Sequence, residues 1–262
     1  MRKLVLLLGG FSLLLVILFC SLRNRLPRGD GSDTANGTAD VRAVSSGQSE
    51  PVRAAAPNVG STTGLAAETG AAVEQRQIEV VRSVVEAVKV PVGVKLTAFY
   101  ASVPSFVRRL EQAGARGVVV FNRFYQPDID LDTLDVDRRL APSTPADLPL
   151  RLHALALLSP TAKLSLACTG GVHSGLDAAK AILSGAHVVQ LASVLLEHGA
   201  QHVSVVRDEL ARWLHEKGYR SSAEARGVLD LRSAPDPHAW ERLNYARMLD
   251  GWRAREGWRK VP

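Results

Sequence analysis

The chain has 262 residues, of which 46% are hydrophobic and 22% are charged. These are ordinary values for a globular protein, and they exclude collagen-like and wholly disordered classes. The 32 Lys and Arg residues outnumber the 26 Asp and Glu residues, a net charge of +6, but the two signs alternate along the sequence and form no basic stripe. We therefore expect no nucleic-acid partner. The two cysteines, Cys20 and Cys168, are too few for a disulfide framework or a Cys-rich zinc site.

The first predicted element is an apolar run. Residues 4–22 carry no charge, and basic residues flank them on both sides. At about 1.5 Å per residue, a helix of this length approaches the roughly 30 Å thickness of the hydrocarbon layer. A cleaved signal peptide is the alternative, but its apolar region is usually about 7 to 15 residues long and ends in small residues. The sequence favours an uncleaved, single-pass membrane anchor over residues 1–26, and the flanking charges leave its orientation undecided.

A second segment, residues 27–70, is rich in Gly, Ser, Thr, Ala, Asn and Asp. Such a composition buries too little apolar surface to offset the entropy of ordering the chain. We expect a flexible, disordered linker here.

From residue 71 to residue 262 the pattern is that of a domain built from strands and helices. Apolar runs typical of buried parallel strands are found at residues 92–96, 117–122, 164–168 and 187–191. Helical spacing of apolar residues is found at 73–88, 106–113, 150–158, 178–183, 203–216 and 237–252. Repeated strand-then-helix order predicts an α/β fold in which four βα units form a parallel sheet with helices outside.

Ligands of such folds bind at the carboxyl ends of the strands. The residues at these four ends are Lys95 with Thr97, Asn122 with Arg123, Thr169-Gly170-Gly171, and Ala192-Ser193. The last two ends are typical of adjoining phosphate-binding loops, because small residues let backbone N–H groups approach an anion near a helix start. Ser174 and Asp177 have the spacing of a capping box, which predicts that a helix begins there.

Several residues near these ends allow more than one interpretation. Lys95 is compatible with three roles, which are an amine that forms a Schiff base, a positive charge that faces an anionic ring, and a surface cation. The side-chain amide of Asn122 has a donor and an acceptor group, so it either forms hydrogen bonds with an amide-like ring edge or caps a loop. His173 is a general base or, as is more common beside a capped helix start, a structural histidine. Five aspartates between residues 128 and 137 lack the glycine and terminal Glu of a calcium loop, so we expect a solvated irregular segment and no metal site.

At these same positions the sequence resembles a known family. The segments that carry the resemblance are Val92-Gly93-Val94-Lys95-Leu96, Phe121-Asn122-Arg123-Phe124-Tyr125-Gln126-Pro127-Asp128, Thr169-Gly170-Gly171-Val172-His173 and Gln190-Leu191-Ala192-Ser193. They resemble the second half of the bacterial dihydroorotate dehydrogenase-like proteins, relatives of the flavin-dependent dihydroorotate and dihydropyrimidine dehydrogenases. The resemblance implies a (β/α)₈ barrel that binds FMN and an oxidoreductase acting on CH–CH groups of a pyrimidine-like substrate. It also favours the cytoplasmic side of the membrane for this domain.

The same resemblance implies the roles of individual residues. It places Lys95 near the pyrimidine edge of the flavin and Asn122 near the flavin or the substrate. Around the phosphate it places the backbones of Gly170, Gly171, Ala192 and Ser193.

The chain also departs from the family. A full barrel takes about 250 residues, whereas roughly 190 follow the linker and four strands can be counted. The first four strands have no counterpart, nor has the loop that carries the family's Cys or Ser base, so no catalytic residue is assigned. We expect a partial (β/α)₈ barrel, weakly active or inactive, that a homo- or hetero-oligomer completes.

Two other functions stay open on the residues alone. One is a phosphate-handling barrel lyase or isomerase that uses Lys95 as its amine, and the other is a non-enzymatic, membrane-anchored module. Absorption by the purified protein in the flavin region, at about 450 nm, would support the oxidoreductase. Borohydride trapping of a carbonyl substrate on Lys95 would support the lyase, and the absence of both would support the module.

Overall fold

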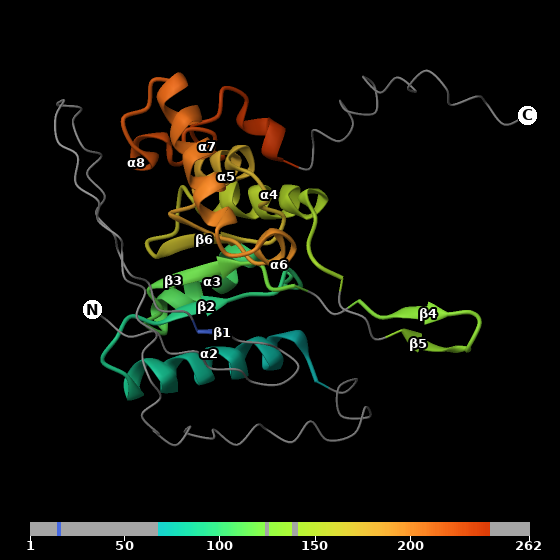
Figure 1. Cartoon of the computed structure of the whole chain (residues 1–262). Coiled ribbons are helices and arrows are strands. Elements are labelled where there is room, and N and C mark those ends of the chain that lie inside the picture. Colours follow the sequence, from blue (N-terminus) through green and yellow to red (C-terminus); the bar gives the residue numbers. More distant parts are fainter. Residues whose placement is uncertain (1–14, 17–67, 124–125, 138–140, 242–262) are drawn as a thin grey trace, which may run out of the picture. The chain divides into compact units, whose positions relative to one another are not determined.

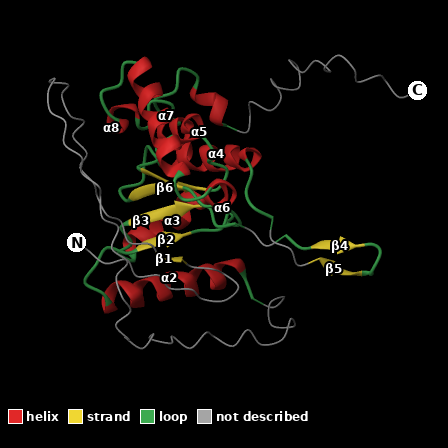
Figure 2. Cartoon of the chain, viewed as in Figure 1, coloured by secondary structure: helices red, strands yellow, loops and turns green. Residues whose placement is uncertain are grey.

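A computed structural model describes residues 15–16, 68–123, 126–137 and 141–241. All of these residues except Glu68 belong to one compact unit. Its centre is a sheet with the strand order β1-β2-β3-β6-β7, and helices pack against this sheet (Figure 1). Figure 2 shows strands and helices alternating along the chain, so the predicted α/β fold is confirmed.

Four strands of the sheet run parallel to one another. They are β2 (Gly93–Lys95), β3 (Gly117–Val120), β6 (Ser165–Thr169) and β7 (Val188–Gln190). Each overlaps one of the four predicted apolar runs. In register, Val118 lies opposite Val94 on one side and opposite Leu166 on the other. This is the sheet expected of part of a (β/α)₈ barrel, in which all carboxyl ends meet at one edge.

Five longer helices match the predicted helical segments. They are α2 (Gly70–Ala87), α3 (Val103–Gln112), α4 (Leu148–Leu158), α5 (Gly175–Leu183) and α7 (His202–Glu216). The main core joins apolar side chains of the first four helices to alternate residues of the strands. In β3, Val118 and Val120 belong to this core, whereas the equally buried Val119 does not, because successive strand side chains point to opposite faces.

The start of α5 follows the prediction closely. Ser174 Oγ accepts a hydrogen bond from Asp177 N at 3.1 Å, and Asp177 Oδ2 accepts one from Ser174 N at 3.1 Å. The predicted capping box is therefore confirmed. The capping box fixes the residue at which α5 begins, so the loop after β6 has five residues between Thr169 and Gly175.

At residues 128–137 the structure differs from the prediction. The predicted irregular segment is a hairpin of two antiparallel strands, β4 (Asp128–Asp130) and β5 (Asp135–Asp137). Ile129 lies opposite Val136, so the alternation of aspartate with apolar residues is the period of two of a strand. Asp130 Oδ1 accepts hydrogen bonds from the backbone N–H groups of Asp132 and Thr133, which close the turn.

The predicted membrane anchor falls almost entirely outside the described residues. Leu15 and Val16 are described, and they form a two-residue strand, β1, that pairs antiparallel with β2. At these two positions the predicted helix is wrong, because an apolar run also suits the unpaired edge of a sheet. The rest of residues 1–26 and the predicted linker up to residue 67 lie outside the described residues. In the described ranges, no helix has the length and apolar character needed to cross a bilayer.

Shorter elements complete the fold. They are α6 (Ser193–His198), α8 (Ser222–Ala225) and the 3₁₀ helices η1 (Pro145–Asp147) and η2 (Pro237–Trp240). The predicted helix over 237–252 begins as η2, and its residues from 242 onward lie outside the described residues. His153 Nε2 lies 2.9 Å from Trp240 O, which holds η2 against α4.

Candidate functional site

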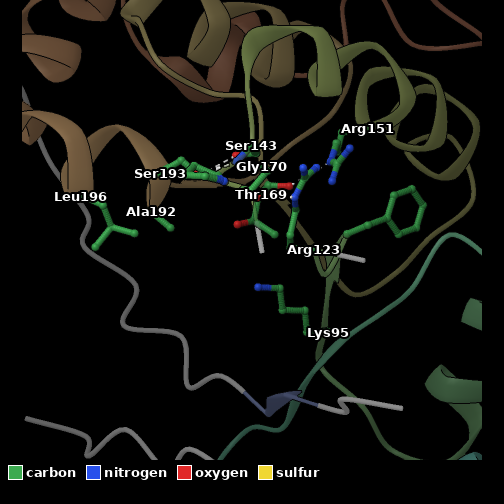
Figure 3. Close-up of a pocket in the computed structure, with 12 residues that line it drawn as sticks. Lys95, Arg123, Ser143, Arg151, Thr169, Gly170, Ala192, Ser193 and Leu196 are labelled. Atoms are coloured by element: carbon green, nitrogen blue, oxygen red, sulfur yellow. Dashed lines mark hydrogen bonds between the residues drawn. The ribbon is translucent and has the colours of Figure 1, made fainter. Parts of the chain in front are cut away.

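A cavity of about 220 Å³ opens at the carboxyl ends of the strands (Figure 3). Its lining comes from the ends of β2, β3 and β6, from the start of α6, from α4 and from the segment before η1. The lining residues are Lys95, Phe121, Arg123, Ala141, Pro142, Ser143, Arg151, Thr169, Gly170, Ala192, Ser193 and Leu196. This is the edge of the sheet at which parallel α/β folds bind their ligands.

Four of the six predicted site residues line this cavity. Lys95 reaches it from the end of β2, Gly170 from the loop after β6, and Ala192 and Ser193 from the loop after β7. Ala192 is the N-cap of α6 and Ser193 its first residue. The structure therefore brings together groups that are nearly a hundred residues apart in the sequence.

The other two predicted residues, Asn122 and Gly171, are not part of the lining. The Asn122 N–H donates to Leu96 O at 2.7 Å, which continues the pairing of β3 with β2. Gly171 has a φ of +82°, and a Cβ atom there would lie 2.5 Å from Leu148 N. Gly171 is thus required for close packing of the loop against the start of α4, which is a different reason from the anion contact that the sequence suggests.

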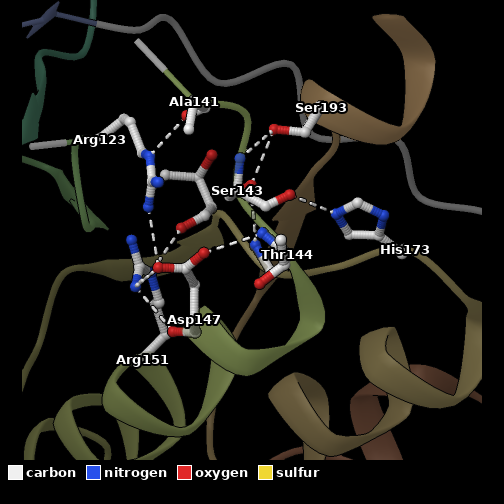
Figure 4. Close-up of polar contacts among 10 residues, drawn as sticks. Arg123, Ala141, Ser143, Thr144, Asp147, Arg151, His173 and Ser193 are labelled. Carbon is white, nitrogen blue, oxygen red and sulfur yellow. Dashed lines mark hydrogen bonds and ion pairs between the residues drawn. The ribbon is translucent and has the colours of Figure 1, made fainter. Parts of the chain in front are cut away.

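The cavity carries a surplus of positive charge. Lys95, Arg123 and Arg151 line it, and the carboxylate of Asp147, which is not part of the lining, lies between the two arginines (Figure 4). Arg123 Nη1 lies 2.8 Å from Asp147 Oδ1, and Arg151 Nη1 lies 4.0 Å from the same oxygen. Among the described residues, these three cations against one carboxylate leave two positive charges. Arg151 is buried and Lys95 and Arg123 are half-buried, and such a surplus is costly to bury unless an anion accompanies it.

Arg151 ties α4 to the end of β6. Its side chain is buried, its Nε donates to Thr169 O at 3.1 Å and its Nη1 donates to Asp147 O at 2.7 Å. A Cβ atom at Gly170 would lie 3.1 Å from Arg151 Nη2, so glycine is what allows the guanidinium to approach this loop. Sequence reasoning missed Arg151, although a single charge within the apolar stretch of α4 is the signal that points to it.

Burial and mutual repulsion set the pKa values in the cavity. Burial lowers the pKa of Lys95 below its usual value, and the positive charge of Arg151 lowers it further. Burial raises the pKa of Asp147, but the hydrogen bond from Thr144 N and the two arginines outweigh it and hold that pKa below its usual value. Asp147 is therefore ionised near neutral pH and serves as a fixed counter-charge for the arginines.

Two other groups near the cavity, His173 and Cys168, have surroundings that favour structural roles. His173 Nε2 lies 2.7 Å from Ser143 O and its Nδ1 lies 3.8 Å from Glu197 Oε2, contacts that fit the structural interpretation of this histidine. Burial raises the pKa of Cys168 to about 12, so its thiol stays protonated and is a poor nucleophile.

Comparison with known proteins supports the resemblance seen in the motifs. Residues 49–214 match the family model described as dihydroorotate dehydrogenase. The chain is 34% identical over 118 residues to dihydroorotate dehydrogenase A (fumarate) of Lacticaseibacillus paracasei, covering 44% of this chain and 40% of that protein. It is 27% identical over 153 residues to the catalytic subunit of dihydroorotate dehydrogenase B (NAD(+)) of Pyrococcus abyssi, covering 57% of this chain and 51% of that protein.

A third relative extends the similarity to a plant enzyme. Dihydropyrimidine dehydrogenase (NADP(+)) of Arabidopsis thaliana, a chloroplastic protein, is 29% identical over 152 residues, covering 53% of this chain and 36% of that protein. The chain spans about half the length, or less, of these relatives. The family model nevertheless covers more than half of the chain and includes all four parallel strands. The chain belongs to the dihydroorotate dehydrogenase family.

Proposed function

We propose that this chain forms the phosphate-binding half of an FMN site in an oxidoreductase of the dihydroorotate dehydrogenase type. The observation that carries the proposal is the cavity at the ends of β6 and β7, where a glycine loop and a helix start meet two surplus positive charges. A phosphate monoester is a dianion at neutral pH, so a cavity with a surplus of positive charge favours it. Family membership supports the choice of FMN among phosphate monoesters.

The described residues fit one end of FMN. Gly170 has a φ of +86°, which aims its backbone as a side-chain-bearing residue rarely can, and a Cβ there would crowd Arg151. At about 220 Å³ the cavity is smaller than the roughly 300 to 1,000 Å³ of complete small-molecule sites. It has room for a phosphate and the adjoining part of a ribityl chain, so most of the ring would extend past the described cavity, beyond Lys95 at its wall.

Each predicted site residue keeps a proposed role. Gly170, Ala192 and Ser193 surround the phosphate, and Lys95 places its ammonium at the pyrimidine edge of the ring. Gly171 acts through packing, and Asn122 meets the ring or the substrate outside the cavity. When bound, FMN supplies a ring that accepts a hydride. The protein's own residues bind, orient and neutralise the phosphate.

The proposed reaction is oxidation or reduction of a CH–CH group in a pyrimidine-like substrate. Among the described residues, none of the cavity-lining side chains is a base suited to take the second proton, because the lining groups are cations, hydroxyls or apolar side chains. We therefore expect this chain alone to turn over dihydroorotate slowly or not at all. Another chain that completes the barrel would supply the missing loops, whereas a second copy would close the barrel but duplicate the phosphate loops and still lack the base.

A binding titration tests this function. Adding FMN and, separately, riboflavin to the purified chain while recording flavin fluorescence measures the affinity for each. Because riboflavin lacks the phosphate, we expect FMN to bind at least tenfold more tightly, a difference of about 1.4 kcal/mol. Equal affinities, or no binding of either, would remove the phosphate assignment.

One observation favours a second candidate, a lyase or isomerase that uses an imine at Lys95. Burial and Arg151 lower the pKa of this amine, which increases the fraction that is neutral and nucleophilic. Sodium borohydride trapping of a carbonyl substrate, followed by peptide mapping, distinguishes the two functions. A stable adduct on Lys95 would favour the lyase, and an unmodified Lys95 in a chain that binds FMN would favour the oxidoreductase.

A further inference from the structure

Ser143 lies where three parts of the cavity wall meet. It belongs to the segment before η1, it is 6% exposed, and it contacts both the loop after β6 and the first residue of α6. Figure 4 shows the dashed lines that join Ser143 to both Ser193 and His173. No sequence motif singles it out.

Four hydrogen bonds hold this serine. Its Oγ accepts from Gly171 N at 3.2 Å, and its Oγ lies 2.8 Å from Ser193 Oγ. Its own N–H donates to Ser193 Oγ at 2.8 Å, and its carbonyl oxygen lies 2.7 Å from His173 Nε2. The two loops assigned to the phosphate are thus joined to each other through one residue.

The two hydroxyl groups of Ser143 and Ser193 carry one more donor hydrogen than their bond to each other uses. A hydroxyl group has one donor hydrogen and two acceptor lone pairs. Ser193 Oγ accepts from Ser143 N, and one hydroxyl hydrogen lies within the Ser143–Ser193 pair. Whichever serine gives that hydrogen, the other keeps its own. Both side chains line the cavity, so the remaining O–H hydrogen is available to a ligand there.

We propose that Ser143 is a positioning residue that turns the Ser193 hydroxyl into a hydrogen-bond donor to the phosphate and holds the two phosphate loops at their spacing. In this assignment the hydrogen between the two hydroxyl oxygens belongs to Ser143, so its N–H and its O–H fill both acceptor positions of Ser193 Oγ and leave the Ser193 O–H to donate. Ser193 is the more exposed of the two and lies at the cavity surface. This inference rests on the proposed function and deepens it, because it explains how a neutral side chain adds to the affinity for an anion.

The test compares the affinities for FMN and riboflavin in variants of the full chain. Ser143→Ala keeps the backbone bonds to Ser193 and His173 but removes the hydroxyl. We expect the affinity for FMN to fall about tenfold, the effect of one hydrogen bond to a charged group, and the affinity for riboflavin to stay unchanged. Ser184→Ala is the matched control, because Ser184 is also a buried serine, with one hydroxyl bond to Lys180 O at 3.0 Å, and lies in another part of the fold.

A second variant covers the case in which Ser143→Ala does not fold. Ser193→Ala removes the donor itself from a half-buried position, and it should cause the same selective loss of FMN affinity. If Ser143 acts through Ser193, the double variant should lose less than the sum of the two single losses. Additive losses, or equal losses of FMN and riboflavin affinity, would overturn the inference and leave the proposed function standing. A wild-type chain that does not prefer FMN would overturn both.

Discussion

The two sides of the cavity are built in different ways. On the side of β6 and β7, the wall consists of backbone and short side chains, with Gly171 packed on Leu148 and Ser143 joined to Ser193. On the side of β2 and β3, the wall consists of Phe121 and the ends of two long cationic side chains, Lys95 and Arg123. The shape of the cavity is therefore fixed on the first side, where even one Cβ atom added at Gly171 would collide with the backbone. The second side supplies positive charge, and its side chains can be replaced at little cost to folding.

The largest expected effect is on the first side. Gly171→Ala should lower the free energy of unfolding by about 4 kcal/mol, because its positive φ costs roughly 1 to 2 kcal/mol and the added Cβ must also displace the Leu148 backbone. Urea denaturation measures the loss. Gly218→Ala is the control, since Gly218 has a φ of +79° with no atom within 4 Å of the added Cβ. Equal losses in the two variants would show that the contact with Leu148 is unimportant.

Arg151 joins α4 to the end of β6 on the first side, and its removal should have the next largest effect. Arg151→Met should cost about 3 kcal/mol, because Thr169 O and Asp147 O each lose a hydrogen bond from a buried charged donor. The control is Arg109→Met, which removes a half-buried ion pair with Glu74 and should cost about 0.5 kcal/mol. If thermal and urea denaturation gave the same small loss for both, Arg151 would not hold α4 to β6.

The helix N-caps on the two sides of the cavity can be compared in the same way, with smaller expected losses of unfolding free energy. Ser174 caps α5 on the first side with a complete capping box, whereas Ser102 caps α3 on the second side with one bond, from Ser105 N at 3.3 Å. We expect Ser174→Ala to cost about 1.5 kcal/mol and Ser102→Ala about 0.5 kcal/mol in unfolding free energy. A larger loss for Ser102→Ala would contradict the view that the first side depends more strongly on its backbone geometry.

The smallest effect on stability is expected at Lys95. Its pKa is lowered in the folded state, so the folded protein binds fewer protons here than the unfolded chain, and this residue's contribution to stability rises with pH up to its usual value of 10.5. Lys95→Met should remove that rise and slightly increase stability at neutral pH, while lowering FMN affinity about tenfold. Urea denaturation between pH 7 and pH 10, compared with the exposed control Lys89→Met, measures the pH dependence. A steeper rise in the Lys95 variant would contradict the sign.

Much of the fold can be predicted from local sequence patterns. The runs at 92–96, 117–122, 164–168 and 187–191 indicate the strands because a strand buried on both faces must be apolar throughout. The capping box at Ser174 is equally local. The β4–β5 hairpin is harder to predict, because its alternating residues are exposed and no core selects the strand over an irregular loop. Six-residue α6 is too short to show a helical period.

The site is less predictable than the fold. Lys95, Gly170, Ala192 and Ser193 can be found because they follow strands whose ends must meet at one edge. Ser143 and Arg151 escape prediction, because their importance comes from contacts with residues that are distant in sequence, such as the bonds from Ser143 to Ser193 and from Arg151 to Thr169. Side-chain hydrogen bonds of this kind depend on the packing of α4 against β6 and have no local signature.

Amide hydrogen exchange of the full chain with and without FMN tests the central claim most directly, because it locates the phosphate as well as detecting it. We expect saturating FMN to slow exchange at residues 170 and 192–194, and riboflavin to leave these amides unchanged. The β4–β5 hairpin serves as the internal control and should exchange equally in all three samples. Slowing by FMN elsewhere in the chain, with the amides of the two loops unaffected, would contradict the assignment of the phosphate to the ends of β6 and β7.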